Sequence, residues 1–198
     1  MAHHDIERRF APLGELRLVE PEGDDAAPVI EGYAAVFNVL SEDLGGFREK
    51  IAPGAFANTI KTADVRALVN HDPNLLLARN KSGTLKLSED EIGLLDTITP
   101  PDTQVGRDTV TSMRRGDLTG QSFAFRTITD SWAMEDGGEV RTLEEVELFN
   151  VSVVTYPAYP DTSVAVRSLD EWRTAHKEDE HTGSRARMGM RLRLADQD

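Results

Sequence analysis

Two long runs of strand-forming residues, joined by a glycine turn, constrain the fold of this chain more than any other feature. Residues 118–129 and 141–155 carry the longest strand signals in the sequence. The segment Glu135-Asp136-Gly137-Gly138 lies between them and is typical of a turn that joins antiparallel strands. The sequence therefore predicts a sheet that contains a long antiparallel hairpin.

Shorter strand signals precede this hairpin, and helical signals are few. Residues 29–37 are rich in β-branched and aromatic side chains, and 47–51 is expected to return beside them after the Gly45-Gly46 turn. Further strands are expected at 65–70, 75–78, 83–87 and 92–98. Helices are expected at 55–61, 103–115 and 168–177. This pattern predicts a mostly β fold of the α+β class, an antiparallel β-barrel or sheet with a few helices outside it.

Composition excludes several classes of protein. The 35 acidic residues outnumber the 22 basic ones and give a net charge of −13, so we expect no nucleic-acid partner. Cysteine is absent, which excludes disulfides, thiolate catalysis and thiolate zinc sites. No apolar run approaches the roughly 18 residues that span a bilayer, and the N-terminus lacks the pattern of a secretory signal. We therefore expect an intracellular protein that is neither secreted nor bound to a membrane.

Changes in composition divide the chain into three segments. Residues 1–28 alternate charges with short apolar pairs and are expected to form a partly flexible extension. Residues 29–168 carry the strand signals and are expected to form the main domain. Residues 169–198 are expected to form a helix followed by a charged tail, which is arginine-rich between 184 and 194.

One histidine and one serine are the candidate catalytic residues. His71 ends the apolar run 68–72 and alone among the five histidines falls within the expected core. Ser122 follows Gly120 inside an alternating apolar run, where the backbone can approach a substrate closely. An imidazole beside a hydroxyl is the base and nucleophile of a serine protease. The alternative is a hydrogen-bonded structural histidine and a packed serine, which is the commoner situation for either residue alone.

A catalytic serine and histidine also need a group that orients the imidazole. The strand signal at 142–154 offers Glu144, Glu145 and Glu147, and Glu147 lies nearest the core because Val146 and Leu148 flank it. A period of two places Glu145 and Glu147 on one face of that strand and Asn150 and Ser152 on the other. Asp72 is a rival orienting group, but neighbours along a strand point to opposite faces. For Glu147, a solvated charge at a strand edge is the plain alternative.

Metal and phosphate sites find no support in the sequence. His71-Asp72 stands without the further histidines and aspartate of a phosphohydrolase site, and the His-Glu-x-x-His pattern is absent. A glycine-rich phosphate loop and the Gly-x-Ser-x-Gly elbow are absent too. We expect neither a cofactor nor a metal ion.

Five segments, taken in order and spacing, resemble one known family. They are residues 32–37, 49–56, 68–72, 118–125 and 146–160. This series is similar to the prohead maturation proteases of tailed bacteriophages over about residues 30–168, so the resemblance covers most of the chain. It implies a fold related to the herpesvirus assemblins, a β-barrel surrounded by helices. It also makes 29–168 the expected protease domain.

The resemblance implies His71 as general base and Ser122 as nucleophile. In the assemblins the third member is a histidine on the strand after the nucleophile strand, and the matching place here falls at Glu147, which implies a Ser-His-Glu triad. Glu145 is the alternative, because a register slip of one pair moves two residues along the same face. The assemblins also have an arginine pair that helps form the oxyanion hole, which residues 153–157 lack. A backbone N–H, or Arg114 or Arg115, is expected instead, although both arginines also suit the end of a helix.

The implied function is that of a serine endopeptidase of procapsid maturation. Its expected substrates are the scaffold protein, the scaffold-like delta segment of the major capsid protein and its own tail. Its expected location is the assembling procapsid in the host cytoplasm. Related viral proteases gain activity by dimerising, which suggests self-association. The alternatives are a catalytically silent protease-fold scaffolding or capsid-assembly factor, and an unrelated hydrolase that uses the same pair on small esters.

Overall fold

A computed structural model describes residues 6–10, 16–20, 27–135, 137–156 and 165–175 of the chain. The chain divides into two compact units, Met1–Asp161 and Thr162–Asp198. The first unit contains every strand of the described residues, whereas the second is described by a helix at 165–175. The arginine-rich tail expected at 184–194 lies outside the described residues.

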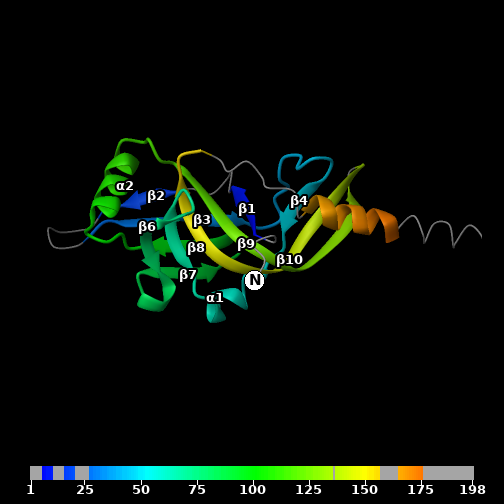
Figure 1. Cartoon of the computed structure of the whole chain (residues 1–198), viewed down its shortest axis with the longest axis horizontal. Helices are drawn as coiled ribbons and strands as arrows, with labels where there is room; N and C mark the ends of the chain where they lie inside the picture. The colour runs from blue at the N-terminus through cyan, green and yellow to red at the C-terminus, as the bar shows by residue number, and fades with distance from the viewer. Residues whose placement is uncertain (1–5, 11–15, 21–26, 136, 157–164, 176–198) are drawn as a thin grey trace, which may run out of the picture. The chain divides into compact units, whose positions relative to one another are not determined.

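A six-stranded sheet carries the long hairpin that the sequence predicts (Figure 1). The strands β9 and β10 pair antiparallel along most of their length, and both continue past their shorter neighbours. The strand order is β1-β9-β10-β5-β6, and β4 also pairs with β10. The bounds are β1 Glu7–Phe10, β4 Arg48–Ile51, β5 Arg66–Val69, β6 Asp72–Arg79, β9 Gly120–Glu135 and β10 Gly138–Val154.

A second, four-stranded antiparallel sheet has the order β2-β3-β8-β7. Its strands are β2 Arg17–Val19, β3 Val29–Val36, β7 Leu85–Glu89 and β8 Gly93–Ile98. The first unit also contains the short helices α1 Thr59–Thr62 and η2 Asn80–Ser82 and the longer α2 Gln104–Arg114. Helix α2 lies within the expected range 103–115, and the Thr103 hydroxyl caps its start by accepting a hydrogen bond from the backbone N–H of Gly106 at 3.4 Å.

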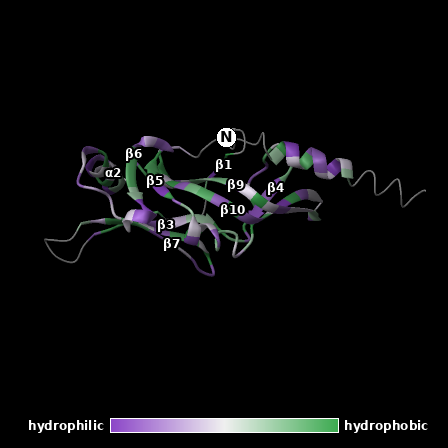
Figure 2. Cartoon of the chain, turned by 60° about the horizontal axis from the view of Figure 1, so that its bottom comes forward, coloured by the Kyte–Doolittle hydropathy of each residue, from purple (hydrophilic) through white to green (hydrophobic). Residues whose placement is uncertain are grey.

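The core consists of the inward side chains of both sheets. Hydrophobic and hydrophilic residues alternate along several of the strands (Figure 2), as a half-buried sheet requires. Phe123 and Phe125 of β9 stack with ring centroids 5.0 Å apart, and Phe56 meets Phe123 edge-on at 5.7 Å. These rings are almost wholly buried, so one face of β9 is fixed to the core.

The architecture corrects two expectations of topology. The described strands form two open sheets rather than the expected closed antiparallel barrel. Strand β4 pairs in parallel with β10, not with β3, and β5 pairs in parallel with β10 further along. The cause is the length of β10. Its edge away from β9 is longer than β4 or β5, so both strands pair with it, each along a different stretch. Parallel pairs are joined by long connections, so no turn signal announces them.

Residues before 29 belong to the sheets to a greater extent than their composition suggests. Strand β1 pairs with β9, and β2 pairs with β3. Each is only three or four residues long, which is too short for a clear periodic signal. Within the described residues, no helix is long and apolar enough to cross a membrane.

Candidate active site

Ser122 lies near the start of β9, on the face of the strand opposite Phe123. Its side chain is completely buried. The glycine two residues earlier is required by packing, because a Cβ at Gly120 would lie 2.8 Å from the ring of Phe10. The segment that comes close to Gly120 is therefore β1, the strand that pairs with the edge of β9 away from β10.

His71 occupies the tight turn between β5 and β6. Asn70 and His71 both have positive φ angles, 51° and 58°, as a two-residue hairpin turn demands. Asparagine tolerates this conformation better than most residues. The Asn70 side chain also holds the turn to the end of β10: its Nδ2 donates to Thr155 Oγ1 at 3.1 Å, and its Oδ1 accepts from the Thr155 backbone at 2.9 Å.

This turn brings His71 to Ser122. The Nε2 atom of the imidazole lies 2.9 Å from Ser122 Oγ. On the other side of the ring, Nδ1 lies 2.7 Å from Asn150 Oδ1 and 3.2 Å from Ser152 Oγ, and both of those residues belong to β10. Residues from two strands and a turn thus form one chain of hydrogen bonds from β10 through His71 to Ser122.

The contacts define the tautomer of His71. Ser152 Oγ donates to Asn150 Oδ1 at 3.1 Å, so this oxygen is an acceptor and the ring nitrogen facing it carries the proton. With the proton on Nδ1, Nε2 presents its lone pair to Ser122 Oγ. This is the tautomer in which an imidazole can accept a proton from a serine hydroxyl.

The surroundings also keep this imidazole neutral. Burial lowers the pKa of His71 below its ordinary value of 6.5, and the positive charge of Arg8 lowers it further, against the opposing effect of the Asn150 hydrogen bond. The rival orienting group Asp72 turns to Asn74, whose backbone N–H donates to Asp72 Oδ1 at 2.8 Å. A lowered pKa leaves His71 available as a base at neutral pH.

The glutamates expected to orient His71 lie elsewhere. Glu147 forms an ion pair with Arg126 of β9, and Glu145 Oε1 accepts from Asn58 Nδ2 at 2.8 Å. A β-bulge between Leu148 and Asn150 explains the difference. The bulge places Asn150 and Ser152 on the same face as Glu147, opposite Ala124 and Ser122 respectively. A strict period of two places Asn150 and Ser152 on the face opposite Glu147. The structure therefore offers Asn150, and not Glu147, as the orienting group.

The arginines considered for the oxyanion hole are engaged in surface ion pairs. Arg114 binds Glu20 with Nε 2.7 Å from Oε1, and Arg115 binds Asp117 with Nε 2.7 Å from Oδ2. Both side chains are more than half exposed, as expected for charges at a helix C-terminus. The structure does not bring them to Ser122 by any contact among the described residues. Those residues also contain no cluster of three groups that could hold a metal ion.

Comparisons with known proteins show the family of this chain. The family described as caudovirus prohead serine protease matches residues 15–177. The chain belongs to this family. The prohead protease of Enterobacteria phage HK97 is 31% identical over 155 residues, which are 75% of this chain and 64% of that protein. The chain thus spans somewhat less than two thirds of the length of that prohead protease.

A solved structure supports the fold. The capsid assembly protease of bacteriophage T4 superposes with a TM-score of 0.52 over 77% of this chain and 99% of that chain. Its sequence identity of 12% means that the likeness concerns the fold alone. The fold of this prohead protease family member is thus mostly β with a few helices, and a relation to the herpesvirus assemblins stays a prediction.

Proposed function

We propose that this chain is a serine endopeptidase of procapsid maturation, with Ser122 as nucleophile, His71 as general base and Asn150 as the residue that orients His71. The single observation that carries the proposal is the continuous chain of hydrogen bonds from Asn150 through His71 to Ser122. An amide replaces the carboxylate of the Ser-His-Asp arrangement, as in the Cys-His-Asn site of papain-like proteases.

The chemistry follows from the positions of the two ring nitrogens. Ser122 Oγ attacks the carbonyl carbon of a peptide bond while its proton passes to His71 Nε2. His71 then gives this proton to the leaving nitrogen, so that the C–N bond breaks and an acyl ester of Ser122 remains. Water hydrolyses the ester with His71 again as base. Throughout, Asn150 Oδ1 holds Nδ1–H and with it the orientation of the ring.

The substrates that we propose are proteins of the assembling capsid. One relative is named a prohead protease and one structural neighbour a capsid assembly protease. We therefore propose that the chain acts inside the procapsid on scaffold protein, on the delta segment of the major capsid protein and on its own chain. Self-association is part of this proposal, because related viral proteases gain activity by dimerising.

Co-expression with the cognate major capsid protein tests the proposal. Intact masses of both proteins should show truncation with the wild-type chain and none with Ser122→Ala. Ser131→Ala is the matched control, because Ser131 is an exposed serine of the same strand that donates to Glu144 at 2.6 Å. Truncation that persists with Ser122→Ala would assign the cleavage to another protease. Assembled shells without truncation in either case would favour a silent assembly factor.

A further inference from the structure

Asp96 is a buried acid that the proposed mechanism does not use. It belongs to β8, and it accepts a hydrogen bond across the core from Gln121 of β9, with Nε2 2.7 Å from Oδ1. Both residues have 0% exposure, and Asp96 Oδ2 and Gln121 Oε1 have no hydrogen-bond partner in the part of the chain that the structure describes. Gln121 directly precedes Ser122. A carboxyl group in the core is thus bonded to the neighbour of the proposed nucleophile.

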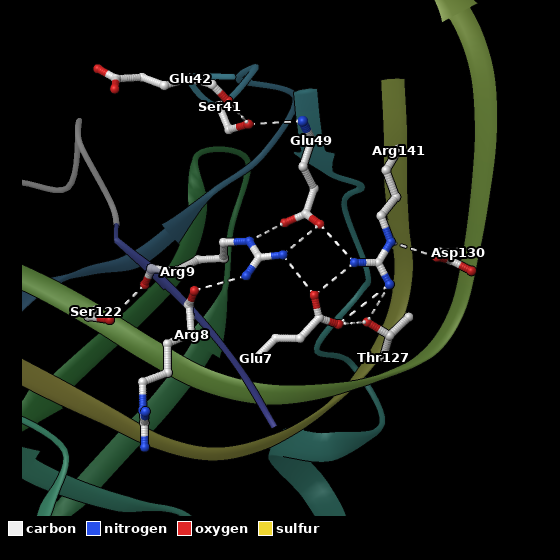
Figure 3. A network of polar contacts seen from close by, with 10 residues as sticks. All are labelled: Glu7, Arg8, Arg9, Ser41, Glu42, Glu49, Ser122, Thr127, Asp130 and Arg141. Atoms are coloured by element: carbon white, nitrogen blue, oxygen red, sulfur yellow. Dashed lines mark hydrogen bonds and ion pairs between the residues drawn. The ribbon is translucent and has the colours of Figure 1, made fainter. Parts of the chain in front are cut away.

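Asp96 differs from the other buried acids in having no basic partner among the described residues. Glu49 accepts from Arg9 Nε at 2.8 Å and from Arg141 Nη1 at 3.0 Å (Figure 3). Glu7 accepts from the same Arg141 nitrogen at 2.8 Å. These two acids are charged and compensated, whereas an ionised carboxylate without a basic partner is costly to bury. The surroundings of Asp96 therefore suit its neutral, protonated form.

The strands packed around Asp96 do not compensate its charge either. Opposite it in the sheet lie two residues that do not titrate, Gly32 of β3 and Leu87 of β7. Glu31 of β3 adds a like charge, which raises the pKa of Asp96 in the same direction as its burial does. On β7, Glu89 shares the face of Leu87, and Lys86 is exposed on the other face. The contact on β9 is a neutral amide, so an uncharged carboxylic acid is the form that this site favours.

Ionisation of Asp96 would disturb β9 rather than β8. At Asp96, β8 is paired on both sides, with β3 and with β7. Gln121 is the second residue of β9 and pairs there with Val153 of β10, while the pairing with β1 begins only at Ser122. A strand end opens at a lower free energy than a strand that is paired on both sides. The start of β9 would therefore yield to admit water, and Ser122 would leave its 2.9 Å contact with His71 Nε2.

We propose that Asp96 is a positioning residue for the nucleophile: its protonated carboxyl group holds Gln121, and through it Ser122, in place beside His71, and loss of the proton releases the start of β9. The inference rests on the proposed function of Ser122 as nucleophile. Asp96 touches neither substrate nor reacting atoms and acts through Gln121 alone. Activity should therefore fall in alkali, although His71 is neutral there and still able to accept a proton.

The rate at which a fluorophosphonate labels Ser122 between pH 7 and pH 9.5 tests this role. Burial raises the pKa of Asp96 to about 8, so the competent, protonated fraction and with it the wild-type rate should fall about tenfold from pH 7 to pH 9. Asp96→Asn keeps an acceptor for Gln121 and cannot ionise. Its rate should match wild type at pH 7 and exceed it about tenfold at pH 9. An equal fall in both chains would overturn the proposal.

Asp90→Asn is the matched control for this pH profile. Asp90 is an exposed acid between β7 and β8, so its variant should lose labelling in alkali as wild type does. Near-ultraviolet circular dichroism at each pH follows the packing of the whole chain. A wild-type signal that is kept at pH 9 while labelling falls is the result expected of a local change. Loss of that signal in step with labelling would assign the fall to global unfolding and would overturn a positioning role.

Hydrogen exchange locates the released segment and separates this inference from the function on which it rests. At pH 9, peptides that cover 118–123 should exchange faster in wild type than in Asp96→Asn, whereas peptides that cover 138–146, at the far end of β10, should exchange equally in both. Equal exchange of 118–123 would contradict release of β9. If Ser122 is labelled at a rate that stays constant to pH 9.5, the positioning role alone fails. If Ser122 is labelled at no pH, the nucleophile is wrong and the positioning role falls with it.

Discussion

The Nδ1 nitrogen of His71 faces an amide rather than a carboxylate, and this sets how the catalytic pair titrates. An amide oxygen can accept the Nδ1 proton, but it adds no full negative charge to stabilise the imidazolium. Burial and the charge of Arg8 therefore prevail, and the pKa of His71 is lowered. We expect a base that is neutral, and hence active, over a wide range around pH 7.

Asn150→Asp tests this arrangement at the scale of one residue. A carboxylate at the Asn150 position should raise the pKa of His71, because its negative charge stabilises the imidazolium. Below its pKa the imidazole is protonated and cannot accept the Ser122 proton, so the acid limb of activity should move to higher pH. The measurement is the pH dependence of fluorophosphonate labelling. An unchanged limb would mean that position 150 does not act on His71.

Asn150→Ala should slow labelling at pH 7.5, yet by far less than His71→Ala. The remaining Ser152 hydroxyl still lies 3.2 Å from Nδ1 and can hold the ring in part. His71→Ala removes the base itself, for which losses of about 10⁴-fold or more are typical. Equal losses in the two variants would show that Asn150 is as essential as the base, contrary to a purely orienting role.

Sequence patterns identify His71 and Ser122 but miss Asn150. The first two stand out because a lone imidazole and a lone hydroxyl interrupt apolar runs. The sequence does not indicate Asn150, because the β-bulge before it moves Asn150 to the opposite face of the strand from the one that a period of two assigns. A bulge depends on the register of two strands, and nothing local in residues 146–152 signals it. Ser152 is missed for the same reason.

At the scale of elements, the β5–β6 turn is the part of the fold that determines the site. Its two residues adopt positive φ angles, and one of them is His71. The turn is short because β6 returns directly beside β5, and it is fixed because Asn70 bonds to Thr155 beyond the end of β10. The position of His71 therefore depends on the side chain of Asn70.

Asn70→Ala should lower the free energy of unfolding by about 1–3 kcal/mol, because the turn loses a residue suited to positive φ and two hydrogen bonds. Asn70→Gly keeps the conformational freedom and should cost less. Denaturant titration measures both. The labelling rate of Asn70→Ala should also fall, since His71 loses its fixed position. A variant as stable as wild type would show that Asn70 does not hold the turn.

A buried acid–amide pair joins the two sheets beside Ser122. Gln121 of β9 donates from Nε2 to Asp96 Oδ1 of β8 at 2.7 Å, while Asp96 Oδ2 and Gln121 Oε1 are both buried without a hydrogen-bond partner in the structure. Burial raises the pKa of Asp96 to about 8. The carboxyl group is therefore protonated at neutral pH, which makes it a donor as well as an acceptor.

This raised pKa predicts that stability falls as the pH increases. Below about pH 4, Asp96 is protonated in the folded and the unfolded chain alike. Above that pH only the unfolded chain releases the proton, so the free energy of unfolding falls by about 1.4 kcal/mol per pH unit until folded Asp96 ionises near pH 8. Asp96→Asn should therefore raise the melting temperature at pH 8 and leave it nearly unchanged at pH 4.

Asp90→Asn is the control for this prediction. The carboxylate of Asp90 accepts from the Tyr33 hydroxyl at 2.7 Å, and that bond lowers its pKa. Its contribution to stability is present above the ordinary pKa and lost in acid, so Asp90→Asn should give no gain at pH 8. If Asp96→Asn also gave no gain there, Asp96 would be ionised in the folded chain.

Secondary-structure elements could be predicted where the sequence signal is local. Strand pairing could not be predicted where it depends on residues far apart in the sequence. The long hairpin β9–β10 and the cap of α2 follow from turn and capping residues. The parallel pairing of β4 and β5 with β10 does not, because it depends on which strands share a long edge. Of the expected barrel or sheet, the described strands show sheets and no closed barrel, for the same reason.

For the whole molecule, the described strands before residue 29, β1 and β2, are integral parts of the two sheets. Strand β1 borders one sheet and β2 borders the other, and Glu7 and Arg9 neutralise charges that are otherwise buried in the core. Composition suggested an extension because these strands are short and their partners lie far along the sequence. We therefore expect the main domain to lose stability when these N-terminal strands are removed.

A chain that begins at residue 29 should unfold at a lower temperature than the full chain. Removal of β1 leaves Glu49 without Arg9 and Arg141 without Glu7, and each lost buried partner is costly. Any folded fraction of the truncated chain should react with a fluorophosphonate faster than the full chain does, because removal of β1 uncovers Ser122. Calorimetry measures the first effect and intact mass the second. Equal melting temperatures would contradict an integral role for these residues.

The most direct measurement of the central claim is a map of the fluorophosphonate adduct. The full chain is labelled, digested and sequenced by mass spectrometry, with His71→Ala and Ser131→Ala beside it. The account predicts one adduct, on Ser122, in the full chain and in Ser131→Ala, and none in His71→Ala. An adduct on another residue, or an adduct on Ser122 that persists without His71, would contradict a nucleophile activated by that histidine.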